Sequence, residues 1–129
     1  MLISSDNSYM YCAANGSDGT NNNNYIFKMN LELTMQWSKA VQYDFDPTFA
    51  FELDSSGTSL YMGLEQTQWS LLKMQTSDGS ASYAKQIHDS YTWNYITLNY
   101  NDQYIYGLYD NSKITIFGNK FLHQNDMKI

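Results

Sequence analysis

Apolar and polar residues alternate with a period of two over much of the chain, which predicts β-strands. The clearest run covers residues 25–41, with large apolar side chains at Tyr25, Phe27, Met29, Leu31, Leu33, Met35 and Trp37. Alternation places side chains on both faces of a strand, whereas at about 100° per residue it would scatter them around a helix. The run is too long for one strand, so we expect a turn at residues 30–34 and little helix in the protein.

The strand pattern recurs as about three copies of a unit of about 45 residues. Each copy opens with a polar turn, then three large residues and a small one, at residues 9–12 (YMYC), 60–63 (LYMG) and 104–107 (YIYG). Lys28-Met29 and Trp37-Ser38-Lys39 of the first copy correspond to Lys73-Met74 and Tyr83-Ala84-Lys85 of the second. The third copy is partial, because it keeps a strand at residues 113–117 but has no Trp-Ser-Lys element.

The second copy predicts four strands, at residues 49–53, 59–64, 69–74 and 81–87. Four antiparallel strands joined by short turns and repeated at this interval are typical of a β-propeller blade. The predicted fold is therefore all-β, with about three four-stranded antiparallel blade-like repeats that form a β-propeller or part of one. The copies cover approximately residues 2–42, 49–89 and 95–122 of a single repeat region.

Glycines and asparagines add detail to this picture. Gly63 and Gly107 are expected where neighbouring blades crowd the backbone. The low-complexity stretch Asn21-Asn22-Asn23-Asn24 is expected to be an exposed turn insertion in the first copy.

Composition supports a folded β-protein and argues against two classes of partner. The chain of 129 residues has twelve Tyr, which suit half-buried pleated surfaces. Its net charge of −6 disfavours nucleic acid and anionic membranes as partners. No apolar run reaches the roughly 18 residues of a transmembrane helix. The N-terminus lacks the basic start and apolar core of a signal peptide. The single cysteine, Cys12, is expected to be a buried, inert thiol in a strand.

The repeat motif resembles a known family. Phe27-Lys28-Met29-Asn30 with Gln36-Trp37-Ser38-Lys39, and Leu72-Lys73-Met74 with Tyr83-Ala84-Lys85, resemble the blades of secreted bacterial β-propeller-repeat proteins. That family's motif is an apolar-Lys-apolar-Asp/Asn strand, a turn that usually contains Gly, and Trp-Ser/Thr-Lys. The first copy lacks the turn Gly. The resemblance implies a propeller fold and an extracellular or cell-surface setting, with no catalytic residue or cofactor to transfer, and it leaves a cytoplasmic setting open.

The number of blades raises a question about assembly. A closed propeller needs about four to eight blades, and this chain holds about three. The chain is then a slice of a longer propeller, or it assembles with copies of itself into a ring or a filament, or its repeats stack in a smaller sandwich.

Candidate sites for metal or catalytic chemistry are weak. Asp44 and Asp46 fall on one side of an extended segment and could offer oxygen ligands to Ca²⁺, but Asp46-Pro47-Thr48 also suits a turn between blades. His88 and His123 have no ligand partners at zinc-site spacing. The carboxylates placed for glycoside hydrolysis by strand position are Glu52, Glu65 and Asp110. We therefore predict no metal site, no cofactor and no enzymatic activity.

Two functions follow from the remaining features. The leading hypothesis is a non-enzymatic structural or protein-interaction module whose partner is another protein or a copy of itself. The alternative is a lectin-like, carbohydrate-binding propeller. Aromatic side chains are candidate contacts to a sugar or a partner at Trp37, Trp69, Tyr83 and Trp93. Asn15-Gly16-Ser17 is a candidate N-glycosylation sequon in a predicted loop.

Overall fold

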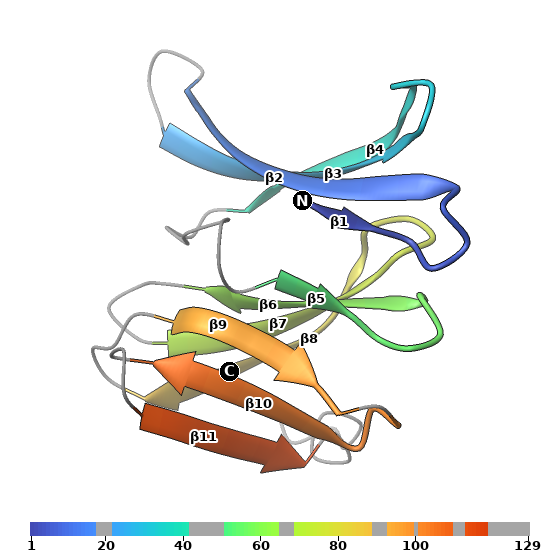
Figure 1. Ribbon diagram of the computed structural model, residues 1–129. Coiled ribbons are helices and arrows are strands. Elements are labelled where there is room, and N and C mark those ends of the chain that lie inside the picture. The colour runs from blue at the N-terminus through green and yellow to red at the C-terminus, as the bar shows by residue number, and fades with distance from the viewer. Residues whose placement is uncertain are drawn as a thin grey trace.

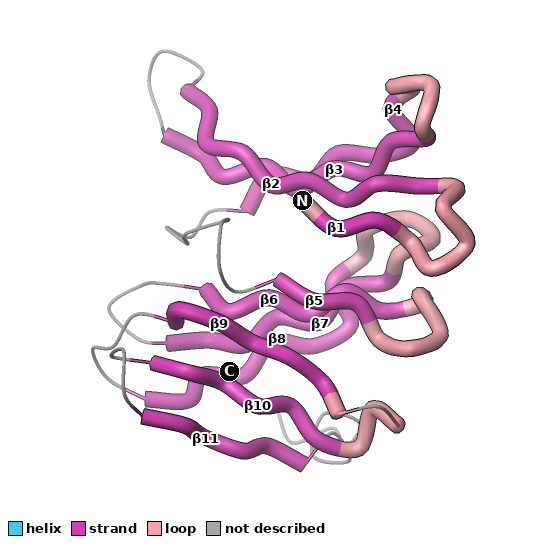
Figure 2. Tube along the Cα trace, viewed as in Figure 1, coloured by secondary structure: helices cyan, strands magenta, loops and turns pink. Residues whose placement is uncertain are grey.

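Three antiparallel β-sheets form the protein in the computed structural model, which describes residues 1–17, 22–41, 51–64, 69–88, 93–99, 101–109 and 113–118. Within these ranges the chain contains strands and no helix (Figure 2), so the all-β prediction is confirmed. The first sheet comprises β1 (Leu2–Ile3), β2 (Tyr9–Ser17), β3 (Asn22–Asn30) and β4 (Met35–Val41). The middle sheet comprises β5 (Phe51–Leu53), β6 (Ser59–Leu64), β7 (Trp69–Gln75) and β8 (Ala81–His88). The third sheet comprises β9 (Trp93–Leu98), β10 (Tyr104–Tyr109) and β11 (Lys113–Gly118).

Strands pair in the order in which they occur along the chain, and each sheet is one meander. The strands predicted at residues 59–64, 69–74 and 81–87 correspond to β6, β7 and β8. The long alternating run of the first copy is divided at residues 31–34, as its length predicted. In the connections that the structure describes, short turns make sequential strands neighbours.

The sheets stack face to face, with the middle sheet between the other two (Figure 1). In an antiparallel sheet alternate residues point to opposite faces, and paired residues point to the same face. Leu60 and Met62 of β6 lie in one buried cluster with Tyr11 and Ile26 of the first sheet. Tyr61 and Gly63 alternate with them and therefore point toward the third sheet. Burial on both faces explains why residues 60–64 of β6 contain no polar side chain except the tyrosine hydroxyl and do not alternate.

Two cores hold the stack together. The core between the first and middle sheets contains Tyr11, Ile26, Phe51, Leu60, Met62, Leu72 and Met74. On the other side of the middle sheet, the buried apolar side chains among the described residues are Tyr61, Leu71, Ile96 and Ile105. Each fully buried apolar side chain contributes about 1.5–3 kcal/mol relative to exposure, before the loss of conformational entropy. The hydrophobic effect therefore holds neighbouring sheets together, while hydrogen bonds set the register of the strands within each sheet.

The same turn precedes the second strand of each sheet. The three turns begin at Ser4, Asp54 and Asn99. In each turn the carbonyl of this first residue accepts a hydrogen bond from the N–H of the residue three positions later, and its N–H donates to the carbonyl of the residue five positions later. The side-chain oxygen of this first residue also accepts a backbone N–H at the start of the strand. The fourth residue has a positive φ at Asn7 (55°), Gly57 (68°) and Asp102 (56°). These residue types tolerate that conformation best, so the turn is encoded locally.

The turns correct the sequence alignment of the copies by one residue. They place Tyr9, Ser59 and Tyr104 at equivalent positions, whereas the sequence pattern matched Tyr9 with Leu60. The equivalent tyrosines are Tyr11, Tyr61 and Tyr106, which pair with Lys28, Lys73 and Ile116. The small residue after each apolar triplet misled the alignment, because Gly63 and Gly107 are not equivalent. Both are buried, and alternation places them on the two surfaces that face each other between the middle and third sheets.

Two predictions for the first copy are wrong. Asn22, Asn23 and Asn24 belong to β3 and are not part of an exposed turn insertion, and the Asn24 side chain is buried. Asn15 lies in β2 and pairs with Asn24 of β3, so the sequon lies in a strand and not in a loop. Pairing of β2 with β3 extends through these polar residues because the antiparallel ladder uses backbone groups that every residue here supplies. Asn21 lies outside the described residues.

Candidate functional site

The carbonyl of Thr76 is the point at which the repeat motifs of two sheets meet. Thr76 follows β7 in the turn before β8, and its side chain is buried. The Lys28 Nζ atom donates to this carbonyl at 3.1 Å, and the Trp37 Nε1–H donates to it at 3.0 Å. Both donors belong to the first sheet, so two motif residues of one copy bind a single oxygen of the next copy.

Thr76 is held in place by the middle sheet. Its N–H donates to the Thr58 carbonyl at 3.0 Å, and its Oγ1–H donates to the Gly57 carbonyl at 2.7 Å. These bonds tie the turn after β7 to the turn before β6. The acceptor is therefore held by bonds within the middle sheet, independently of its contacts with the first sheet.

Gly79 makes room for the Trp37 ring in the same turn. Gly79 is buried and has a φ of 71°. A Cβ atom at this position would lie 2.8 Å from Trp37 Cε3 and 3.0 Å from side-chain carbons of Lys39. The Trp37 ring also packs beside Tyr11, with ring centroids 6.3 Å apart and a tilt of 48°. The Trp-x-Lys element of one sheet thus covers the glycine turn of the next.

Two tyrosines support the Lys28 side chain. The Lys28 Nζ atom lies 3.9 Å from the centroid of the Tyr9 ring and 5.7 Å from that of Tyr11. Burial lowers the pKa of Lys28, and the negative charge of Asp6 opposes this effect. Burial also raises the pKa of Tyr11, partly offset by a hydrogen bond with the Thr76 side chain. Cation–π contacts and the Thr76 carbonyl therefore replace the water that this ammonium group loses.

The polar groups of Lys28 and Trp37 both bind the middle sheet at its junction with the first sheet. Trp37 was the aromatic candidate for sugar or partner contact in the first copy, and it is half-buried with its N–H bonded to Thr76. Trp69, Tyr83 and Trp93 lie in β7, β8 and β9, and their side chains fall outside the described residues, as does the side chain of Asn15. Trp37 therefore packs against Tyr11 and Gly79. The described side chains do not include a surface shared by the four aromatic candidates.

Among the carboxylates considered for catalysis, Glu52 is the one that the structure describes. It lies on β5, pairs with Tyr61, and is half-buried on the face toward the third sheet. Burial raises its pKa, partly offset by hydrogen bonds from the Leu53 N–H and the Thr97 hydroxyl. Glu65 and Asp110 fall outside the described residues, as do Asp44 and Asp46.

Replacing Glu52 with Gln should change the pH dependence of stability. A raised pKa means that folded Glu52 keeps a proton where the unfolded side chain has lost it, so stability falls as pH rises from 4.5 through the raised value. We expect Glu52→Gln to be more stable than the parent at neutral pH, and this advantage to shrink as pH falls through the raised pKa and to be largely lost at 4.5 and below. Urea unfolding across pH measures this, with Glu32→Gln in an exposed turn as the control for charge. An equal gain at every pH would contradict the prediction.

No group of three or more metal-ligating side chains occurs in the part of the chain that the structure describes. Within the same residues no helix is long and apolar enough to cross a membrane. Cys12 is half-buried on the outer face of the first sheet, which differs from the expected buried thiol.

Thr76 and Gly79 are the functional residues that the sequence pattern missed. Asp78-Gly79 is visible in the sequence as a turn signal, and the turn is where the pattern places it. The pattern gave no sign that this turn receives a tryptophan from 39 residues earlier in the chain. A polar carbonyl contributes nothing to a side-chain pattern, so only the stacking of the sheets reveals its role.

Comparison of the sequence with protein-family models and with curated proteins found no match.

Proposed function

We propose that this protein is a non-enzymatic structural or protein-interaction module built from β-propeller-type repeats, which associates with copies of itself. The observation that supports the proposal is how the repeat uses its distinctive residues. Lys28 and Trp37, the most chemically capable members of the motif, hold one sheet against the next. Meanwhile the outermost faces of the stack expose large apolar side chains, among them Ile3, Met35, Tyr95 and Tyr104.

Exposed apolar sheet faces favour protein contact over catalysis. Large apolar patches on a soluble protein mark interaction surfaces. A catalytic site needs convergent polar groups with perturbed pKa values in a cleft. The raised pKa of Glu52 is explained by burial alone, which the hydrogen bonds from Leu53 and Thr97 oppose. An extracellular or cell-surface setting is part of the proposal and rests on the resemblance of the repeat motif.

Carbohydrate binding is the second candidate, and one observation favours it. Tyr95 and Tyr104 are 52% and 44% exposed on the outer part of the third sheet. Exposed tyrosine rings offer flat faces on which a sugar can stack, with hydroxyl groups for hydrogen bonds. The repeated aromatic position weighs against it, since Trp37 is used between sheets and the third copy has no counterpart.

Sedimentation velocity over a wide concentration range tests the proposed function. We expect species larger than the monomer, with a population that grows with concentration. A glycan array probed with the same protein tests the alternative. A monomer at every concentration, together with saturable binding of one saccharide class that Tyr95→Ala abolishes, would replace the proposal with a lectin function.

A further inference from the structure

The junctions between sheets in this protein all have the same direction. At the first junction, the face of the first sheet that bears Tyr9, Tyr11 and Ala13 packs on the face of the middle sheet that bears Leu60 and Met62. At the second junction, the opposite face of the middle sheet, with Tyr61, meets the face of the third sheet that bears the buried Ile105. A tyrosine face of one sheet thus meets the aliphatic face of the next. Such head-to-tail contacts are heterologous, so they can continue.

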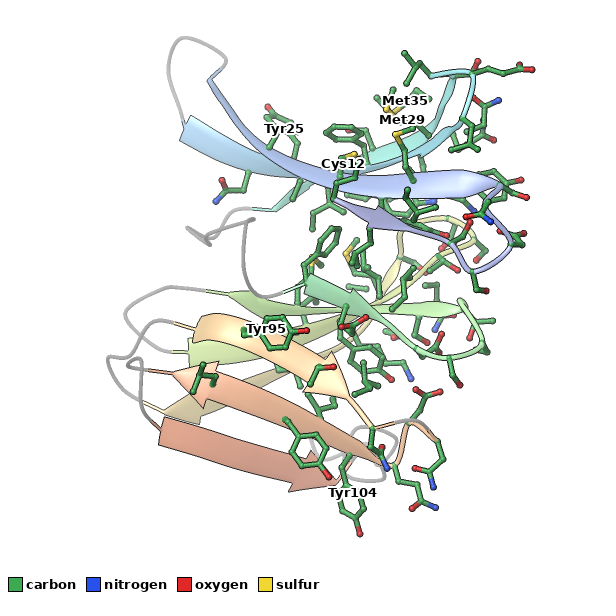
Figure 3. All side chains as sticks on the ribbon, viewed as in Figure 1. Cys12, Tyr25, Met29, Met35, Tyr95 and Tyr104 are labelled. Atoms are coloured by element: carbon green, nitrogen blue, oxygen red, sulfur yellow. The ribbon has the colours of Figure 1, made fainter. Side chains whose placement is uncertain are left out.

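The first sheet leaves its aliphatic face open. This open aliphatic face carries Ile3, Met10, Cys12 and Met29, which pair across β1, β2 and β3. The corresponding residues of the middle sheet are Leu53, Leu60, Met62 and Met74, which the first sheet covers. Figure 3 shows Cys12, Tyr25, Met29 and Met35 on the side of the first sheet that points away from the middle sheet.

The contrast in burial marks this face as one that lacks its neighbour. Leu60 and Met62 are 0% exposed at the junction, whereas their counterparts on the open aliphatic face, Met10 and Cys12, are only half-buried. Among the described side chains that register places on this face, none is charged. Apolar surface of this kind is stabilised by removal from water.

The third sheet leaves its tyrosine face open at the other end. Alternation and register place Tyr95, Tyr104, Tyr106 and Leu108 together on this open tyrosine face. Tyr106 is equivalent to Tyr11 and Tyr61, both of which are covered at the existing junctions. In the free chain Tyr95 and Tyr104 are about half exposed, and Figure 3 shows them on the third sheet.

The two open faces differ from the first junction in ways that match each other. At the position of Gly79, which receives Trp37, the first sheet has Leu33, with a φ of 64° and 66% exposure. A tryptophan from a preceding sheet would collide with the Leu33 side chain, given that even a Cβ at Gly79 would lie 2.8 Å from Trp37. The third copy has no such tryptophan, since none occurs after residue 93.

The lysine of the repeat motif is also absent from the third sheet. Ile116 occupies the register position of Lys28 and Lys73 in the third sheet. At the position of Thr76 the first sheet has Leu31, which keeps a backbone carbonyl but has an apolar side chain, 51% exposed, in place of the threonine hydroxyl. The copy without the lysine and tryptophan donors would therefore meet the sheet whose turn has the exposed apolar side chains of Leu31 and Leu33.

We propose that the open tyrosine face of the third sheet docks on the open aliphatic face of the first sheet in a second copy of this chain, and that two such junctions close a ring of two copies. Two copies of three sheets make six, within the range of about four to eight blades that closes in propellers. The inference deepens the proposed function and depends on its self-association. It continues an interface that the chain already makes twice.

Charge-introducing variants test the direction of the contact. Ile3→Glu blocks the open aliphatic face and Tyr104→Glu blocks the open tyrosine face, at positions exposed enough for a charge to leave the monomer folded. Ser5→Glu and Gln103→Glu, in exposed turns beside them, are the matched controls. Circular dichroism verifies folding. We expect a dimer for the parent and both controls, and a monomer for each blocked variant alone.

Mixing the two blocked variants gives the decisive measurement. Each retains one functional face, so an equimolar mixture should form a dimer through one junction and sediment faster than either variant alone at the same total concentration. Alkylation of Cys12 by a maleimide, slow in the parent dimer and faster in Ile3→Glu, provides an independent readout.

Each other outcome overturns the inference in a recognisable way. A variant that still dimerises alone would show that its face is not used, and a mixture that stays monomeric would exclude head-to-tail docking. Polymers that lengthen with concentration would exclude a closed ring. In these cases the parent still associates, so the proposed function survives, whereas a monomeric parent contradicts both.

Discussion

Trp37→Ala is expected to lower the free energy of unfolding by about 3 kcal/mol, the lower end of the range for truncation of a large aromatic side chain. The variant loses the packing of the indole on Tyr11 and over Gly79, and the hydrogen bond to the Thr76 carbonyl. The lower end applies because Trp37 is half-buried. Urea unfolding followed by circular dichroism measures the change.

Trp37→Phe is the matched control for this prediction. It retains an aromatic ring at the junction and removes the indole N–H, so we expect a loss of about 1 kcal/mol plus a small packing term. Thr76 still accepts a bond from Lys28 in either variant. If Trp37→Ala cost no more than Trp37→Phe, the ring would contribute little, and the junction would depend on Lys28 and the apolar core.

Gly79→Ala is expected to lower the free energy of unfolding by about 2–4 kcal/mol. An alanine with a φ of 71° suffers backbone strain of about 1–2 kcal/mol. The rest comes from overlap of the new methyl group with Trp37 and Lys39, which a rigid indole ring cannot avoid without leaving the junction. Chemical unfolding of the purified variant measures the sum.

Gly57→Ala separates the two contributions. Gly57 has a φ of 68°, and a Cβ built there meets nothing within 4 Å, so the variant has the backbone strain alone. The difference between the two alanine variants is the steric cost of the junction. When Trp37 is also replaced with Ala, the difference in unfolding free energy between Gly79→Ala and Gly57→Ala should shrink, because the indole ring that the new methyl group overlaps is no longer present. Equal costs for Gly79→Ala and Gly57→Ala would disprove the placement of Trp37 over the turn.

Local pattern was enough to predict the strands of this protein. Alternation, the Asp54 to Gly57 turn and the Asp78-Gly79 turn each act within a few residues, so they are visible in the sequence. The asparagine run failed as a predictor, because Asn22–Asn24 pair through their backbone in β3 regardless of their polar side chains. The one-residue error between Leu60 and Tyr9 arose because both strands are apolar enough to fit either register.

The sequence by itself determined an all-β chain of repeated antiparallel meanders, with Lys28 and Trp37 as its distinctive residues. Tertiary structure alone decided what those residues do, since Thr76 and Gly79 come to them from the next sheet. It also decided which faces are covered and which stay open. Strand formation depends on neighbours along the chain, whereas the stacking direction depends on which surfaces meet after the turns have placed them, and no local pattern encodes that choice.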